Sequence, residues 1–241
     1  SNLSEQTFSI IRNDELYNNL KKNLIHDKFV KFKKNRNYKK IIKENYNLII
    51  NCDLNNQITK KFFSKTIKKN YYSYAYTTII SHKKLIKNDT ASQIFTKNGP
   101  IAFLPISKTQ TSVVYSLKTK FSKNMDDIKR LIYKFNPNYD IIKIGTISKV
   151  GLNSSNLRNY YKDNILAFGD LLHKVHPLAG QGFNMSLRDI SCLSKLIDEK
   201  LDLGLDLDTT ICRNFEKEMR DKNLIFATGI DWIYQFFYFE G

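Results

Sequence analysis

The stretch Gly169–Asp189 has the sequence GDLLHKVHPLAGQGFNMSLRD and predicts a turn from a buried strand, through a glycine-containing loop, into a helix. The segment just before it, NILAFG at 164–169, is a continuous apolar run, typical of a central strand covered on both faces. After the loop, apolar residues recur with the spacing of one helix face; they are Phe183, Leu187, Ile190, Leu193 and Ile197.

This stretch has the features of a ligand site. Asp170 follows the carboxyl end of the strand, where open α/β sheets place their ligands, and its carboxylate can accept hydrogen bonds from sugar hydroxyls. Pro177 stiffens the loop, and Gly180 and Gly182 let the backbone approach a ligand closely. The helix that starts near Gly182 directs its free N–H groups at the loop, which favours an anionic group.

Two other interpretations fit the same residues. The glycines could simply close a turn between strand and helix. Asp170, His173 and His176 recur every three residues, which suits metal ligands on a helix face, but Pro177 follows at once and the run starts from a strand end. We therefore expect no metal here, and a structural hydrogen-bonding role for each histidine.

The stretch resembles the second flavin-binding motif of the flavoprotein monooxygenases related to para-hydroxybenzoate hydroxylase, in the branch that hydroxylates ubiquinone precursors. HPLAGQGFN followed by LRD carries this resemblance. A second block at 95–105, FTKNGPIAFLP, resembles the F-T-x-x-G-P-x-A-x-L-P segment of that branch. The similarity is collinear from about residue 8 to the end of the chain.

The resemblance implies roles for individual residues. Asp170 would bind the ribityl chain of FAD. The loop beside the flavin would be formed by Pro177, Gly180, Gln181 and Gly182. The backbone N–H groups of Phe183 and Asn184 would face the pyrimidine edge of the ring, while Leu104 and Pro105 would lie on its substrate side. Arg188 and Asp189 would pin the helix.

The chain departs from the family at two places. The D-G-x-x-S-x-x-R signature corresponds to DLNNQITK at 53–60, where Asp53 remains but Leu54, Gln57 and Lys60 replace the glycine, serine and arginine. The altered signature leaves Asp53 either a cofactor-binding residue or a plain strand-end residue. The G-x-G-x-x-G motif that holds the ADP half of FAD is not in this sequence, so we expect a fragment, a split polypeptide or a decayed copy.

The implied function is an FAD-dependent monooxygenase that uses NAD(P)H and O₂ to hydroxylate the ring of a polyprenylated phenol in ubiquinone biosynthesis. No acid–base residue stands out, so the catalytic residues stay unassigned. One alternative is a non-catalytic scaffold without FAD in a quinone-biosynthesis complex. The altered signature at 53–60 favours this alternative, and the intact loop at 169–184 opposes it. A third interpretation is a flavin hydroxylase for another hydrophobic aromatic compound.

Composition limits the surroundings in which the protein works. The net charge is +16, but lysine is mixed with asparagine, isoleucine and tyrosine throughout, so we expect no nucleic-acid partner. No apolar run approaches the roughly 20 residues of a membrane span. We expect a bacterial cytoplasmic protein with peripheral contact to the inner membrane through its basic surface and the aromatic tail at 232–239. Cys52, Cys192 and Cys212 form no CxxC pair, which indicates a reducing compartment where they act as small apolar residues.

The expected fold is α/β with an α+β insert: an incomplete FAD-binding, Rossmann-like layer into which a mostly antiparallel substrate sheet is inserted. Residues 1–68 would belong to the FAD-binding domain, 69–150 to the substrate sheet, 151–202 again to the FAD-binding domain, and 203–241 to a C-terminal helical region. The pattern predicts helices at 14–24, with a buried stripe, and at 125–135, 183–197 and 213–238. It predicts strands at 48–50, 71–81, 101–106, 112–117, 140–150 and 164–169, and a short hairpin within 28–43.

Overall fold

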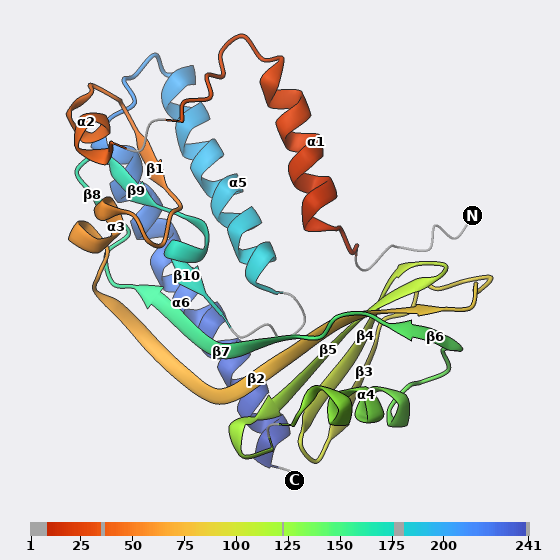
Figure 1. Ribbon diagram of the computed structural model, residues 1–241. Coiled ribbons are helices and arrows are strands. Elements are labelled where there is room, and N and C mark those ends of the chain that lie inside the picture. Colours follow the sequence, from red (N-terminus) through yellow and green to blue (C-terminus); the bar gives the residue numbers. More distant parts are fainter. Residues whose placement is uncertain (1–8, 35–36, 122, 176–180, 240–241) are drawn as a thin grey trace, which may run out of the picture. The chain divides into compact units, whose positions relative to one another are not determined.

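The structure is a computed structural model that describes residues 9–34, 37–121, 123–175 and 181–239. The chain divides into two compact units (Figure 1). We call Ser1–Arg36 with Tyr74–Val150 the sheet unit, and Asn37–Ser73 with Gly151–Gly241 the α/β unit. The functional boundaries expected at residues 68, 150 and 202 concern cofactor and substrate binding, and they stay a prediction.

A short mixed sheet lies in the α/β unit. Its order is β1 (Ile49–Asn51), β9 (Ile165–Ala167), β8 (Tyr161–Lys162), with β1 and β9 parallel and β8 antiparallel to β9. All three residues of β9 are buried, as the apolar run at 164–169 predicts. Two more short elements follow β9: the 3-10 turn η2 (Gly169–Leu171) and β10 (His173–Lys174).

Helices complete the α/β unit. They are α2 (Tyr38–Lys43), α3 (Gln57–Phe62), α5 (Gln181–Asp202) and α6 (Thr209–Phe239), and α5 packs along α6 (Figure 1). Its main core joins the strand residues Leu166 and Phe168 to Leu193 of α5 and Phe215 of α6. This core fixes the end of β9, and therefore the start of the loop at 169, against the two long helices.

The sheet unit is built on the long strand β2 (Thr66–His82), which begins in the α/β unit. Hydrogen-bonded neighbours follow the order β10, β7 (Ser148–Leu157), β2, β5 (Gln110–Lys118), β4 (Gly99–Ser107), β3 (Ser92–Thr96), and β6 (Ile141–Ile144) pairs with β2. The β3–β4, β4–β5, β2–β6 and β7–β10 pairs are antiparallel. Helix α4 (Met125–Lys134) crosses the sheet, and its Ile128 and Ile132 are buried against Tyr76, Phe103 and Tyr115. The fold class expected from the sequence is confirmed.

Two local predictions are wrong. The segment 28–43 holds no hairpin in its described residues; it contains the helix α2, capped by the Asn37 side chain, which accepts the N–H of Lys40 at 3.3 Å. The strand predicted at 140–150 is two strands, β6 and β7, separated at Gly145, whose N–H donates to the carbonyl of Ile79 at 2.9 Å. A Cβ on Gly145 would lie 3.0 Å from that carbonyl oxygen, so the backbone passes too close to β2 for another residue type. Strand β3 was not predicted from the sequence.

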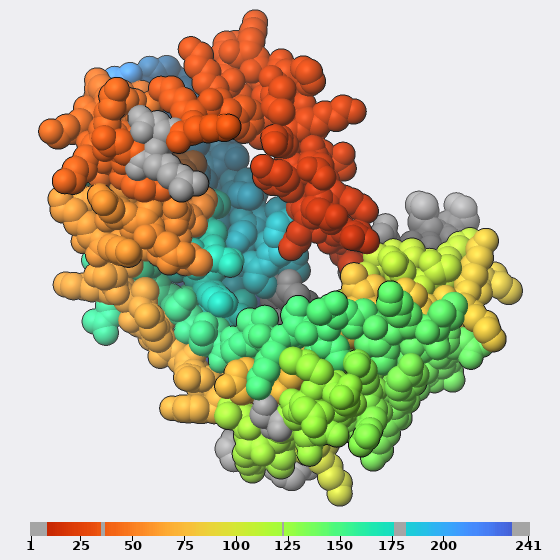
Figure 2. All heavy atoms as spheres, viewed as in Figure 1, coloured from red at the N-terminus to blue at the C-terminus, as the bar shows by residue number. Residues whose placement is uncertain are grey.

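The first helix, α1 (Asn13–Ile25), forms where it was predicted, but it buries no residue. Tyr17, Leu20 and Leu24 are 61 %, 54 % and 42 % exposed, and the space-filling view shows this helix as uncovered surface (Figure 2). The expected buried stripe is therefore wrong within the described residues.

Helix α5 also buries a different face from the one predicted. Met185, Asp189, Leu193 and Leu196 are buried, whereas Phe183, Leu187 and Ile190 are about half exposed. The buried face is rotated from the predicted one by about one residue, or roughly 100°. The rotation brings a carboxylate, Asp189, into the interior, and this residue has a defined partner there.

Candidate functional site

Two acidic residues follow neighbouring parallel strands. Asn51, the last residue of β1, pairs with Ala167, the last residue of β9, and the N–H of Phe168 donates to the carbonyl of Asn51 at 3.0 Å. Parallel strands end at the same edge of a sheet, so Asp53 and Asp170 leave the sheet at one edge. The carboxyl-end edge of a parallel sheet is the place where α/β folds bind ligands.

Asp170 is held in a defined turn and is available to a ligand. Gly169 adopts φ +63°, in the left-handed region that favours glycine, and a Cβ there would meet nothing within 4 Å. Glycine is therefore needed here for the turn itself. Asp170 lies within η2, which packs against α5, and its side chain is exposed. Its carboxylate makes no hydrogen bond or ion pair with any residue in the described part of the chain.

Asp53 is already engaged by its own neighbourhood. Its carboxylate accepts the N–H of Asn55 at 2.7 Å and the hydroxyl of Tyr38 at 3.3 Å. The altered signature folds into a loop and helix α3, because the Asn56 side chain caps that helix by accepting the N–H of Thr59 at 2.8 Å. Leu54 is 52 % exposed and has no positive φ, so this backbone does not require the family's glycine.

The predicted flavin loop is only partly described. Pro177 and Gly180, like His176, lie outside the described residues. Gln181 begins α5, and its side chain lies outside the described part as well. Gly182, Phe183 and Asn184 form the first turn of α5, at the end of the helix where its dipole is positive.

Among the described residues, no close contact requires a glycine at position 182. Its φ is not left-handed, and a Cβ would make only an ordinary contact, 3.8 Å, with Cγ2 of Val175. The neighbouring Phe183 is 53 % exposed. A helix N-terminus attracts anionic groups, and the exposed carboxylate of Asp170 can accept hydrogen bonds from hydroxyl groups.

A buried polar cluster lies behind this site. His173 and Asp189 are 2 % and 0 % exposed, and Nε2 of His173 is hydrogen-bonded to Oδ2 of Asp189. The other oxygen, Oδ1, accepts from Nδ2 of Asn223 at 3.1 Å, and the hydroxyl of Tyr160 lies close enough to Asn223 and Asp189 to interact with both side chains electrostatically. Burial is the main reason why the pKa of Tyr160 is raised to about 12.

The sequence led us to expect a structural His173 and an α5 pinned by Arg188 and Asp189, and the contacts agree with both. The Arg188 guanidinium lies 4.1 Å from the ring centre of Phe226 on α6. Asn223 and Tyr160 were missed, because nothing near them in the sequence indicates a buried amide or phenol. Across the described residues no group of three metal-ligating side chains comes together.

The predicted substrate residues belong to the sheet unit. Leu104 and Pro105 lie near the end of β4, opposite Ser112 and Thr111 of β5. Side chains alternate along a strand, so they point to opposite faces: Pro105 is buried and Leu104 is half-buried. Leu104 is therefore the residue of the two that remains accessible to a substrate.

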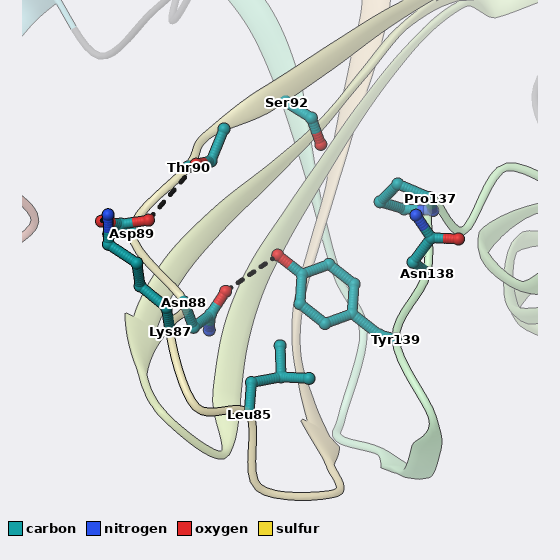
Figure 3. Close-up of a pocket in the computed structure, with 9 residues that line it drawn as sticks. All are labelled: Leu85, Lys87, Asn88, Asp89, Thr90, Ser92, Pro137, Asn138 and Tyr139. Atoms are coloured by element: carbon teal, nitrogen blue, oxygen red, sulfur yellow. Dashed lines mark hydrogen bonds and ion pairs between the residues drawn. The ribbon is translucent and has the colours of Figure 1, made fainter.

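A cavity of about 340 Å³ lies at the same end of the sheet unit (Figure 3). It is lined by Leu85, Lys87, Asn88, Asp89, Thr90, Ser92, Pro137, Asn138 and Tyr139. Asn88 fixes its wall: Oδ1 accepts the Tyr139 hydroxyl at 3.1 Å, and Nδ2 donates to the Ser107 carbonyl at 2.7 Å. The lining is polar apart from Leu85, Pro137 and the Tyr139 ring.

The three cysteines are free thiols in different surroundings. Cys52 is exposed, Cys192 is half-buried and Cys212 is buried in the core of the α/β unit. Burial is the main cause that raises the pKa values of Cys192 and Cys212, each to about 11. Cys212 acts as a small apolar residue, as predicted, whereas the exposed Cys52 does not.

Comparison with known proteins agrees with this geometry. Residues 102–203, which include η2 and α5, match the FAD binding domain family. The chain is similar in sequence to FAD-dependent monooxygenases of ubiquinone biosynthesis. It is 24 % identical over 226 residues to the ubiquinone biosynthesis monooxygenase COQ6 of Danio rerio, an alignment that covers 76 % of this chain and 47 % of that protein. It is 26 % identical over 157 residues to 3-demethoxyubiquinol 3-hydroxylase of Escherichia coli, covering 61 % and 39 % of the two chains.

Solved structures show the same fold. PqsL, a probable FAD-dependent monooxygenase from Pseudomonas aeruginosa, superposes with a TM-score of 0.58 at 18 % identity, covering 80 % of this chain and 56 % of that one. The flavin-dependent brominase Bmp2 superposes with a TM-score of 0.61 at 13 % identity, covering 80 % and 53 %. The family resemblance inferred from the loop at 169–189 is thus confirmed. The chain spans about half the length of the curated relatives it matches first.

Proposed function

We propose that this chain contributes the second flavin motif and the substrate sheet of an FAD-dependent monooxygenase. The observation that carries the proposal is the exposed carboxylate of Asp170, which has no hydrogen-bond or ion-pair partner among the described residues and is placed by Gly169 at the carboxyl end of β9, in an element that packs against α5. The match of residues 102–203 to an FAD binding domain family supports it.

In this proposal, each described site residue has a binding role. Asp170 accepts hydrogen bonds from the ribityl hydroxyls of FAD, and the N–H groups of Phe183 and Asn184 donate to the anionic edge of its ring. Gly182, with Pro177, Gly180 and Gln181, makes room for the ring. Asp53, already bonded to Asn55 and Tyr38, contributes a second carboxylate at the same sheet edge.

Bound FAD would supply the redox chemistry, in which reducing equivalents from NAD(P)H and O₂ would be used to place one oxygen atom on an aromatic ring while the other would leave as water. The chain's residues would bind, orient and exclude water. We propose a polyprenylated phenol of ubiquinone biosynthesis as substrate, with the accessible Leu104 facing it and the buried Pro105 holding the strand beneath. The names of the relatives from Danio rerio and Escherichia coli support this choice. The relatives come from several eukaryotes as well as from Escherichia coli, so a bacterial source also stays a proposal.

We also propose that the protein is cytoplasmic and contacts the membrane peripherally. Its partners there would be other proteins of ubiquinone biosynthesis. None of the helices within the described ranges is both long and apolar enough to cross a membrane. The basic composition and Trp232, which is 73 % exposed on α6, support contact with an anionic surface.

The alternative is a scaffold that keeps the fold without FAD. One observation favours the scaffold. The glycine, serine and arginine of the family signature are replaced by Leu54, Gln57 and Lys60, and all three of these residues are exposed. The Asp170 carboxylate favours the enzyme instead, because no described residue forms a hydrogen bond or ion pair with it.

Flavin titration separates the two. We expect the purified chain to bind FAD, with absorbance near roughly 450 nm, and Asp170→Ala to weaken the binding at least about 10-fold, since a bond to a charged group is lost. Asp198→Ala removes another exposed carboxylate, on α5, and should leave the affinity unchanged. No flavin uptake by the unaltered chain would favour the scaffold, and equal affinity of the Asp170→Ala variant would remove that residue from the site.

A further inference from the structure

The buried cluster of His173, Asp189, Asn223 and Tyr160 draws together four separate segments of the α/β unit. His173 lies on β10, Asp189 on α5, Asn223 on α6, and Tyr160 in the segment that leads to β8. All four side chains are at least 98 % buried. A carboxylate in such a place is costly unless its oxygens are hydrogen-bonded, and both oxygens of Asp189 are.

The cluster holds both ends of the predicted flavin loop. His173 comes three positions after Asp170, in the strand that enters the loop. Asp189 comes eight positions after Gln181, about 12 Å along the helix that leaves it. The hydrogen bond between them therefore ties the segment that bears Asp170 to the helix whose first turn bears Phe183 and Asn184.

Packing alone does not require this arrangement. Apolar residues of similar volume often replace a buried polar pair without loss of stability, so such a pair is weak evidence for stability as such. A hydrogen bond adds direction, because it weakens steeply when its angle departs from linearity. Nδ1 of His173 and Oδ1 of Asn223 have no partner within the described part of the chain. Two buried polar atoms of the cluster are thus left without a hydrogen bond among the described residues.

We propose that His173 and Asp189 are positioning residues for the flavin: their hydrogen bond fixes the first turn of α5 relative to Asp170. The inference rests on the proposed function and deepens it, since it assigns a role in cofactor binding to residues that do not touch the cofactor. Asn223 holds the second carboxylate oxygen and keeps Asp189 directed at the histidine.

Two substitutions of Asp189 test the inference. Asp189→Asn keeps an oxygen that accepts from Asn223 and an amide that can donate to a neutral His173, whereas Asp189→Leu keeps only the volume. We expect Asp189→Leu to weaken FAD binding about 10-fold or more and to speed hydrogen exchange of the amides at 182–186 by a similar factor, with Asp189→Asn within about 3-fold of the unaltered chain.

Ile211→Ala is the matched control. Ile211 is 1 % exposed at the start of α6, twelve positions from Asn223, so its truncation lowers stability without touching the pair. It should leave FAD affinity and the exchange at 182–186 unchanged. If Asp189→Leu does not fold, His173→Gln, which can still donate to Asp189, and His173→Leu, which cannot, make the same comparison.

The outcomes separate this inference from the proposed function. If the unaltered chain takes up no FAD, the proposed function fails and the inference fails with it. If the chain binds FAD and Asp189→Leu binds it equally well, or if Ile211→Ala matches Asp189→Leu in both measurements, only the positioning role is overturned.

Discussion

Two glycines of the α/β unit offer a clean comparison between a strained turn in the site and one outside it. Gly169 and Gly204 adopt φ +63° and +65°, and a Cβ on either would meet nothing within 4 Å. Alanine would therefore add backbone strain without a clash. We expect Gly169→Ala and Gly204→Ala to lower the free energy of unfolding by similar amounts, about 1–2 kcal/mol each, in urea titrations.

Their effects on FAD should differ. Gly169 sets the direction of Asp170, whereas Gly204 lies in the connection between α5 and α6. We expect weaker FAD binding in Gly169→Ala alone, measured by the same titration as for Asp170→Ala. A Gly204→Ala variant with equally weakened binding would mean that stability, and not the turn at Gly169, governs the affinity.

The sequence shows residues of the site only where the signal is local. Asp170 is predictable because a strand end, a glycine and a helix start lie within a short stretch. Tyr160 and Asn223 are not, because they meet Asp189 from 29 and 34 positions away and their own surroundings carry no pattern. The effect of Leu54 was also beyond the sequence, since it depends on a backbone angle that turned out not to be left-handed.

At the scale of elements, α5 has one covered and one uncovered apolar face. Leu193 is 5 % exposed and packs in the core, whereas Leu187, six positions earlier, is 46 % exposed. We expect Leu193→Ala to lower the free energy of unfolding by about 2–4 kcal/mol and Leu187→Ala by less than about 1 kcal/mol. Urea titrations of the two variants against the unaltered chain measure both values. A large loss in Leu187→Ala would show that its face is covered in solution.

Periodicity predicted the helices well and their orientation less well. Apolar spacing gives the helix at 181–202, but two apolar stripes share that helix, and only the tertiary partners β10 and α6 decide which one is buried. The predicted strand at 140–150 failed for a similar reason. Its residues suit a strand throughout, and the break at Gly145 arises from the close approach of Ile79 on a distant strand.

Over the whole molecule, the residues proposed to bind the flavin and the residues proposed to contact the substrate belong to different units. The candidate flavin residues Asp53, Asp170 and Gly182–Asn184 all belong to the α/β unit, and Leu104 and Pro105 belong to the sheet unit. The FAD binding domain match spans parts of both units. If these proposed roles hold, we expect substitutions in the α/β unit to alter cofactor binding and substitutions in the sheet unit to alter substrate binding.

The net charge of +16 predicts that the protein is attracted to anionic lipid surfaces. We expect the protein to sediment with phosphatidylcholine vesicles in which roughly one third of the lipid is anionic, and not with vesicles of phosphatidylcholine alone. Raising the salt from about 0.1 M to about 1 M shortens the Debye length from about 10 Å to about 3 Å, so it should release most of the bound protein.

The single tryptophan, Trp232, reports on how the surface is contacted. It is 73 % exposed on α6, at the start of the aromatic tail. If the tail enters the interface, the fluorescence of Trp232 shifts to shorter wavelength on binding anionic vesicles, because the indole leaves water. Sedimentation without that shift would mean that charge alone attracts the protein, and the tail would then have no part in the membrane contact.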